Sequence, residues 1–173
     1  MKSRFPLALA ISLLLAAPRV SAQSPSAESD SLSAPKQTPS FRREDHPYHK
    51  HPAKGALPTI LDAEQFRNKP QSYVAYALAA KMPGLLYQQP CLCACGKERG
   101  HKSLLDCFTG LHGRNCDECK IEVFYCYEQH KKGWSAKKIR KAMFHYKFLE
   151  INFKEYARAQ WQAMTADSPG AKE

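Results

Sequence analysis

Residues 91–126 read CLCACGKERGHKSLLDCFTGLHGRNCDECKIEVFYC and contain all seven cysteines of the 173-residue chain. Four glycines divide residues 91–115, and we expect this part to be irregular. Irregular loops of this length are uncommon in a compact domain unless something pins them. Thiols are the groups available for that purpose, so we expect the fold to be organised around them.

The sequence on either side of this loop predicts an all-α fold, a small bundle of four to five short helices around the central irregular Cys-rich loop, with no sheet. Pro70 marks the start of one helix, because proline is favoured at the first helical position. This helix should end by Met82, since Pro83 disfavours the helical conformation at the residue before it.

The remaining helices are expected after the loop. Asn115 is predicted to cap a helix that ends at Gly133, and Ser135 to cap the next one. Residues 136–167 contain neither glycine nor proline, so this last helix either continues or bends near Asn152.

Composition divides the chain into four segments. We predict a signal peptide at 1–22, a disordered polar linker at 23–57, a Cys-rich helical domain at 58–150 and a helical tail with a disordered end at 151–173. The domain therefore has only about a hundred residues with which to build a core.

An export signal is predicted at the N-terminus. Lys2 and Arg4 precede an apolar run at 7–17, and Val-Ser-Ala at 20–22 forms a small-residue cleavage site. The apolar run is about half as long as a membrane-spanning helix, so we expect no transmembrane helix after cleavage. The predicted location is periplasmic or extracellular, an oxidising environment in which thiols form disulfides unless a metal or a reductant protects them.

The formal net charge of +10 is partly concentrated in one predicted helix. Seven lysines and arginines lie between Lys131 and Lys147 with no acidic residue among them. The part from Lys137 to Lys147 is either a solvated helix face or a surface for an unknown protein partner or an anionic surface. Nucleic acid is not expected as a partner because the chain carries an export signal.

The C-x-C-x-C motif is the first part of a predicted thiol site. In an extended chain, side chains two residues apart point to the same side, so Cys91, Cys93 and Cys95 would form a row of sulfurs with Leu92 and Ala94 facing the other way. Such a row suits Cu(I) or Zn(II), which prefer thiolate ligands. It suits internal disulfides badly, because neighbours of this kind rarely reach the required geometry.

The C-x-x-C pair at the start of a helix is the second part, since helix N-termini favour thiolates. A histidine in the intervening loop adds a possible nitrogen ligand. The predicted metal ligands are Cys91, Cys93, Cys95, His101, Cys107, Cys116 and Cys119.

Other candidate residues receive weaker assignments. The role of His112 is left open, and Cys126, two helical turns beyond the C-x-x-C pair, is interpreted as a buried core residue. His46, His49 and His51 form either a metal-binding tract or part of a polar tail.

Three hypotheses for the function follow from these residues. The first is binding of a soft metal ion, copper or zinc, as a carrier, buffer or structural centre. The second is a thiol–disulfide oxidoreductase in which Cys116 and Cys119 exchange with the upstream cysteines. The third is a structural or partner-binding domain stapled by three disulfides. No Ser/His/Asp triad, paired-carboxylate site or phosphate-binding glycine loop is present in the sequence, so an enzyme other than the oxidoreductase is not predicted.

Several stretches resemble the exported bacterial CYCXC, or PCYCGC-motif, family. They are QQPCLCACG at 88–96, HKSLLDCF at 101–108 and HGRNCDEC at 112–119, and the resemblance extends over about residues 57–146. Here the family's usual aromatic residue in the first gap is Leu92. The family has no established function, but some members are similar except that they carry selenocysteine within the motif. This resemblance implies a reactive chalcogen at the motif rather than a set of structural disulfides.

Overall fold

The computed structural model describes residues 45–93 and 95–166, which fall within one compact unit of the chain. Within these ranges every regular element is a helix and no strand occurs, which confirms the predicted all-α fold. No helix in the same ranges has the length and apolar composition needed to cross a bilayer. The predicted signal peptide at 1–22, the linker up to residue 44 and the last residues of the tail lie outside the described part.

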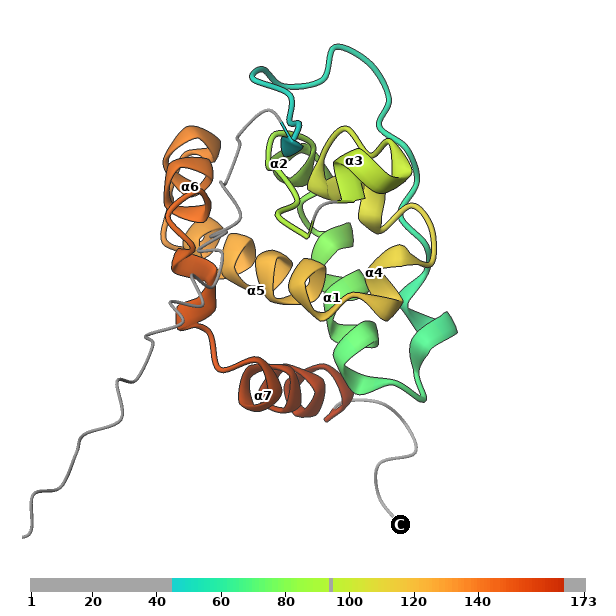
Figure 1. Ribbon diagram of the computed structural model, residues 1–173. Helices are drawn as coiled ribbons and strands as arrows, with labels where there is room; N and C mark the ends of the chain where they lie inside the picture. The colour runs from blue at the N-terminus through green and yellow to red at the C-terminus, as the bar shows by residue number, and fades with distance from the viewer. Residues whose placement is uncertain (1–44, 94, 167–173) are drawn as a thin grey trace, which may run out of the picture. The chain divides into compact units, whose positions relative to one another are not determined.

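The helices are shown in Figure 1. The four longer ones are α1 (Pro70–Ala80), α5 (Asp117–Lys131), α6 (Ala136–Met143) and α7 (Phe153–Thr165). Shorter elements are α2 (Pro83–Tyr87), α3 (Cys95–Arg99), α4 (His112–Asn115) and the 3-10 helices η2 (Ala63–Phe66), η3 (Leu104–Cys107) and η4 (Lys147–Glu150). The loop predicted to be irregular thus contains three short helical turns, because its glycines separate turns rather than abolish them.

Helix α1 forms where the sequence predicts it, with Pro70 at its first position and its end before Pro83. It packs against both α5 and α7 (Figure 1). The Tyr76 side chain is fully buried, and its hydroxyl donates to the carbonyl of Gly110 at 2.5 Å and accepts from the amide of Arg114 at 3.1 Å. Tyr76 therefore joins α1 to the cysteine-containing loop.

Helix α5 begins one residue later than predicted. Its N-cap is Cys116 and not Asn115, and the Cys116 Sγ accepts the amide of Cys119 at 3.5 Å. The backbone reverses at Gly133, whose φ of +74° favours glycine. The predicted cap at Ser135 is confirmed, because its hydroxyl accepts the amide of Lys138.

The predicted long helix after Ser135 is broken earlier than expected. Helix α6 ends at Met143, Tyr146 takes a left-handed conformation (φ 56°), and η4 follows. Asn152, where a bend was predicted, caps α7 by accepting the amide of Glu155. Helix α7 returns to α1, where the Trp161 ring lies 4.8 Å from the Tyr73 ring in a T-shaped contact.

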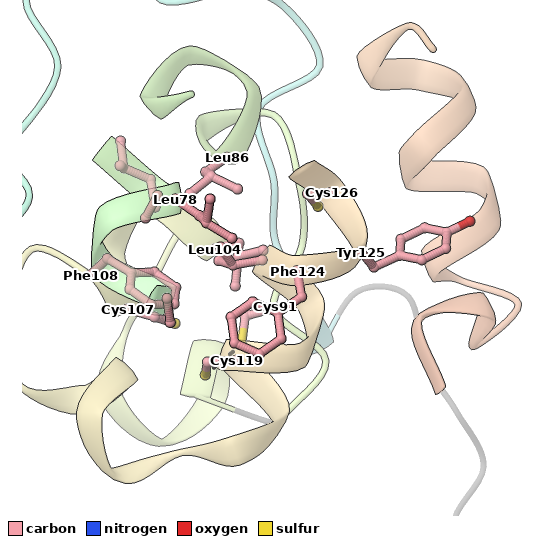
Figure 2. Close-up of a cluster of buried hydrophobic side chains, with 14 of the residues drawn as sticks. Leu78, Leu86, Cys91, Leu104, Cys107, Phe108, Cys119, Phe124, Tyr125 and Cys126 are labelled. Carbon is pink, nitrogen blue, oxygen red and sulfur yellow. Dashed lines mark hydrogen bonds between the residues drawn. The ribbon is translucent and has the colours of Figure 1, made fainter. Parts of the chain in front are cut away.

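Five of the cysteines, at positions 91, 95, 107, 119 and 126, are part of the hydrophobic core, and Figure 2 labels all of these except Cys95. Large side chains from α1, α2, η3 and α5 surround them and exclude water. The fully buried members drawn in Figure 2 include Leu78, Leu86, Leu104, Phe108 and Phe124, together with the cysteines at 107, 119 and 126. The loop is thus held by apolar packing as well as by its sulfurs.

Residues 45–49, which we call the strap, lie against the helical domain and differ in this from the expected disordered linker. His46 is buried, and the ring of Tyr48 lies 5.8 Å from that of Phe144. The His49 ring stacks on Tyr87 with centroids 3.7 Å apart. These rings bury enough surface to order a segment whose overall composition is polar.

Gly96 allows the strap to approach the motif, and Gly96→Ala is expected to displace it. An added Cβ would lie 2.6 Å from Pro47 Cδ and 3.1 Å from the carbonyl oxygen of Asp45. Overpacking of this kind costs about 1–3 kcal/mol, which corresponds to a rise of about 5- to 150-fold in the population with the strap open. Limited trypsin digestion at Lys50 should therefore become at least about fivefold faster.

Gly84→Ala is the matched control, because no atom lies within 4 Å of an added Cβ at that position. Equal cleavage rates for the two variants would show that the close approach does not hold the strap.

Candidate metal centre

Six cysteines converge from four separate parts of the chain. Cys91 and Cys93 precede α3, Cys95 begins α3, and Cys107 ends η3. Cys116 caps α5, and Cys119 lies in its first turn. All seven are free thiols in this structure, and six of them, together with His101, lie in one cluster as the sequence predicted.

Cys91, Cys93 and Cys119 form a triangle of sulfurs. The Sγ–Sγ distances are 3.2 Å between Cys91 and Cys93, 3.3 Å between Cys91 and Cys119, and 3.4 Å between Cys93 and Cys119. The prediction of an extended row is wrong, because side chains on one face of a strand are about 6.6 Å apart. The chain bends at Leu92 and Cys93 and enters α3 at Cys95, so the sulfurs converge; Ala94 lies outside the described residues.

A second group lies beside this triangle. The Cys95 and Cys107 sulfurs are 3.5 Å apart, and His101 Nδ1 is 3.3 Å from the Cys107 sulfur. Cys95 and Cys107 are buried, whereas His101 is partly exposed. The loop histidine is therefore placed at the edge of the sulfur cluster, between the buried thiols and solvent.

His112 is the residue that sequence analysis left open and the structure brings into the cluster. Its Nε2 lies 3.4 Å from the Cys93 sulfur, and its ring meets that of His101 edge to face at 5.2 Å. Its position a few residues before the C-x-x-C pair is the one sequence signal that could have identified it.

The donor atoms form four overlapping groups, and within each group all atoms lie within 4.8 Å of one another. The groups are Cys93, His112, Cys116 and Cys119; Cys95, His101, Cys107 and His112; Cys91, Cys93 and Cys95; and Cys91, Cys107 and Cys119. Zn–S bonds of about 2.3 Å at tetrahedral angles place two sulfurs about 3.8 Å apart. The shortest sulfur–sulfur distances of 3.2–3.5 Å are somewhat smaller than this, so a bound ion would require the sulfurs to move apart by about half an ångström.

A family model described as a protein of unknown function with a PCYCGC motif matches residues 13–150. The chain belongs to this family. Its PCYCGC motif is Pro90 to Cys95, read here as P-C-L-C-A-C. None of the curated proteins and none of the solved structures matches the chain. The resemblance inferred from the sequence is thereby confirmed, and the function has to be argued from the site.

The thiols of the PCYCGC cluster differ in acidity. Hydrogen bonds from Cys116, Cys119 and Cys91 hold the pKa of Cys93 far below its ordinary value. Burial alone would lower the pKa of His112, but the hydrogen bond to Cys93 raises it, and the net shift is upward. The lowered pKa favours the thiolate form of Cys93, which is the form that binds a metal.

Glu122 of α5 holds the backbone of the PCYCGC motif in place. Its Oε1 accepts the amide of Leu92 at 2.7 Å, and the residue is completely buried. Burial raises the pKa of Glu122 well above its ordinary value and thereby favours the neutral carboxyl. From the other side, His46 Nδ1 donates to the carbonyl of Cys91 at 3.0 Å. Both groups fix the backbone that carries Cys91 and Cys93.

Glu122→Ala is expected to destabilise the domain by about 1–3 kcal/mol, because it leaves the buried amide of Leu92 without an acceptor. Metal affinity should fall about 10- to 100-fold, as is typical when a group that orients the ligands is lost. Urea unfolding and competition with a chromogenic chelator measure the two effects. Glu122→Gln, which keeps the acceptor oxygen, should restore both; failure of both variants alike would show that the hydrogen bond does not act in this way.

The other sequence assignments have different outcomes. Cys126 lies in the core, where its sulfur contacts Met143 Sδ at 3.5 Å, and Figure 2 shows it apart from Cys91, Cys107 and Cys119. The histidine tract does not gather around one point: His46 and His49 contact different parts of the domain, and no donor group among the described residues includes either.

The predicted basic helix is shorter than expected. Helix α6 ends at Met143, so Lys147 belongs to η4. Arg140 serves the fold, because its Nη1 donates to the carbonyl of Gln88 at 2.6 Å and its guanidinium lies 4.4 Å from the centre of the Tyr48 ring. The lysines at 137, 138, 141 and 147 are exposed.

Proposed function

We propose that this PCYCGC-family protein binds a soft or borderline metal ion through its thiol and imidazole cluster, with Zn(II) preferred and Cu(I) as the alternative ion. The observation that carries the proposal is the arrangement of the sulfurs. Cys91, Cys93 and Cys119 each lie within 3.4 Å of the other two. A disulfide joins only two sulfurs, at about 2.05 Å, so the third sulfur of the triangle would have to pair elsewhere, whereas one metal ion binds all three.

The composition of the donor set supports Zn(II). Three thiolates with one imidazole is a common structural zinc set, and His112 and His101 supply imidazoles at two places. Burial of uncompensated thiolate charge is costly, and a divalent ion cancels twice the charge that Cu(I) cancels. The bound ion would hold α3, η3 and α5 together, and would supply the cross-links that a domain of this size needs.

The decisive experiment is elemental analysis of the purified protein combined with thiol counting before and after reduction. Stoichiometric zinc or copper, with thiols that become alkylated only after chelation, is expected. Metal-free protein with six cysteines locked in non-reducible bridges would refute the proposal in favour of disulfide staples. A single easily reduced pair at Cys116 and Cys119 would instead favour the oxidoreductase, which a reduction potential below about −300 mV for every pair would exclude.

Export is part of the proposal, because it determines whether the thiols need protection by a metal. The charged start, the apolar run and the small residues at 20–22 support it. Expression of the full chain in a Gram-negative host should yield a periplasmic protein whose N-terminal sequence begins at Gln23. Arginine at Leu13 and Leu14, in the middle of the apolar run, should leave the uncleaved chain in the cytoplasm. Cytoplasmic retention of the unmodified chain would contradict export.

A further inference from the structure

We propose that the cluster holds two metal ions, each bound by three thiolates and one imidazole; this inference rests on the proposed metal-binding function. The outer set is the donor group of Cys93, Cys116, Cys119 and His112, and the inner set combines Cys95, Cys107 and His101 of the second group with Cys91. Together the two sets use every donor in the cluster once.

The number of donors is the first argument. Zinc in protein sites of this kind is almost always four-coordinate, so a single ion would leave four of the eight donors without a metal. Cys91, Cys95 and Cys107 are almost completely buried, and buried polar groups without a partner are costly. A second ion would bind these three buried thiols, which a single outer ion would leave without a partner.

The outer set is already arranged as a four-donor site. Its three sulfurs and the imidazole nitrogen of His112 all lie within 4.8 Å of one another. The shortest of these contacts are Cys93–Cys119 at 3.4 Å and His112–Cys93 at 3.4 Å. An ion at the centre needs only small displacements of these side chains.

The inner set is built around the sulfur of Cys107. Cys95 and His101 lie 3.5 and 3.3 Å from its sulfur, and Cys91 lies within 4.8 Å of both Cys95 and Cys107. His112 is also near this set, but its closest sulfur is that of Cys93, which assigns it to the outer ion.

Sulfur atoms of the two sets are in direct contact. Cys91 of the inner set lies 3.2 Å from Cys93 and 3.3 Å from Cys119 of the outer set. At these distances a thiolate of one ion is a neighbour of the other, so the pair forms one binuclear centre rather than two separate sites.

The two ions differ in their access to solvent. Cys93, Cys116 and His112 are partly exposed, whereas the three inner cysteines are buried. A surface pocket of about 460 Å³ is lined by both His101 and His112 and gives an entry path to the cluster. The inner ion is therefore structural, and the outer ion is the one that exchanges with solution or with a metal acceptor.

Native mass spectrometry of the full mature chain, reduced and then loaded with Zn(II), tests the stoichiometry. Two ions per chain are expected, and a limiting amount of chelator should remove one of them much faster than the other. One ion per chain would overturn the binuclear centre and leave the proposed function intact, whereas no bound ion would refute the proposed function itself.

Variants locate the two ions. Cys116→Ser and His112→Ala should each retain one slowly exchanging ion, with far-UV circular dichroism showing that the domain is still folded. The matched controls are Cys126→Ala and His145→Ala, which lie outside the cluster and should retain two. Loss of both ions from a folded outer-set variant, or retention of both, would overturn the division into two sets.

Discussion

Chelation of the metal under reducing conditions is expected to lower the thermal midpoint of the domain by at least about 15 °C. An ion present at about a thousand times its dissociation constant stabilises a fold by about 4 kcal/mol, and each kcal/mol shifts the midpoint of a small domain by about 4 °C or more. The cause is local: without the ion, the buried thiols of Cys91, Cys107 and Cys119 lose the partner that would join them. Far-UV circular dichroism during heating, with and without a strong chelator, measures the shift.

Two controls complete this experiment. Reductant without chelator should leave the midpoint unchanged, because no disulfide is being broken, and added Zn(II) should restore the value after chelation. A midpoint that falls with reductant alone would instead identify disulfides as the stabilising cross-links. An identical midpoint in all conditions would show that neither metal nor disulfides stabilise the fold.

Cys119→Ser is expected to destabilise the zinc-loaded domain by about 5 kcal/mol, the second of the two large effects. The variant buries a hydroxyl without a partner, which costs about 1–3 kcal/mol, and removes a ligand that adjoins both sets of donors. The loss of binding energy from one ion adds about 4 kcal/mol or less at a thousandfold excess of zinc. Urea unfolding in the presence of Zn(II) measures the change in the free energy of unfolding.

Cys126→Ser is the matched control, since it makes the same chemical change at an equally buried position of the same helix. It lacks contact with the cluster and should cost only the 1–3 kcal/mol or so of an unsatisfied hydroxyl. The difference between the two variants should disappear once the metal is chelated. Equal destabilisation in the presence of zinc would contradict a role for Cys119 as a ligand.

Local sequence signals predicted the helices well where one residue controls the backbone. Pro70, Pro83 and Ser135 each act through their own covalent structure or side chain, and the structure places helix boundaries beside all three. The break at Tyr146 was missed, because a left-handed tyrosine has no sequence signature and is held by contacts that form only in the folded domain.

The cysteine cluster was predictable as a set but not in its shape. The spacing of the thiols identified six of the residues that the structure brings together, along with His101. The sequence could not show that the motif bends, since the bend depends on Glu122, a residue thirty positions from Leu92. The sequence of α5 does not distinguish Glu122 from a surface glutamate, and its role becomes visible only when the amide that it accepts is known.

The position of the strap in the sequence determines when the cysteine cluster can be covered during synthesis. During synthesis residues 45–49 appear first, yet the surfaces on which they rest, Cys91 with Gly96 and later Phe144, appear about fifty and a hundred residues afterwards. His46 can therefore reach the Cys91 carbonyl only after residue 91 has been made, and Tyr48 can reach Phe144 only when most of the domain exists. Until then the motif is uncovered on that side. The covering of the centre is thus completed by a segment made before it, and until the strap docks the nascent centre is open on that side to loading with metal and to oxidation.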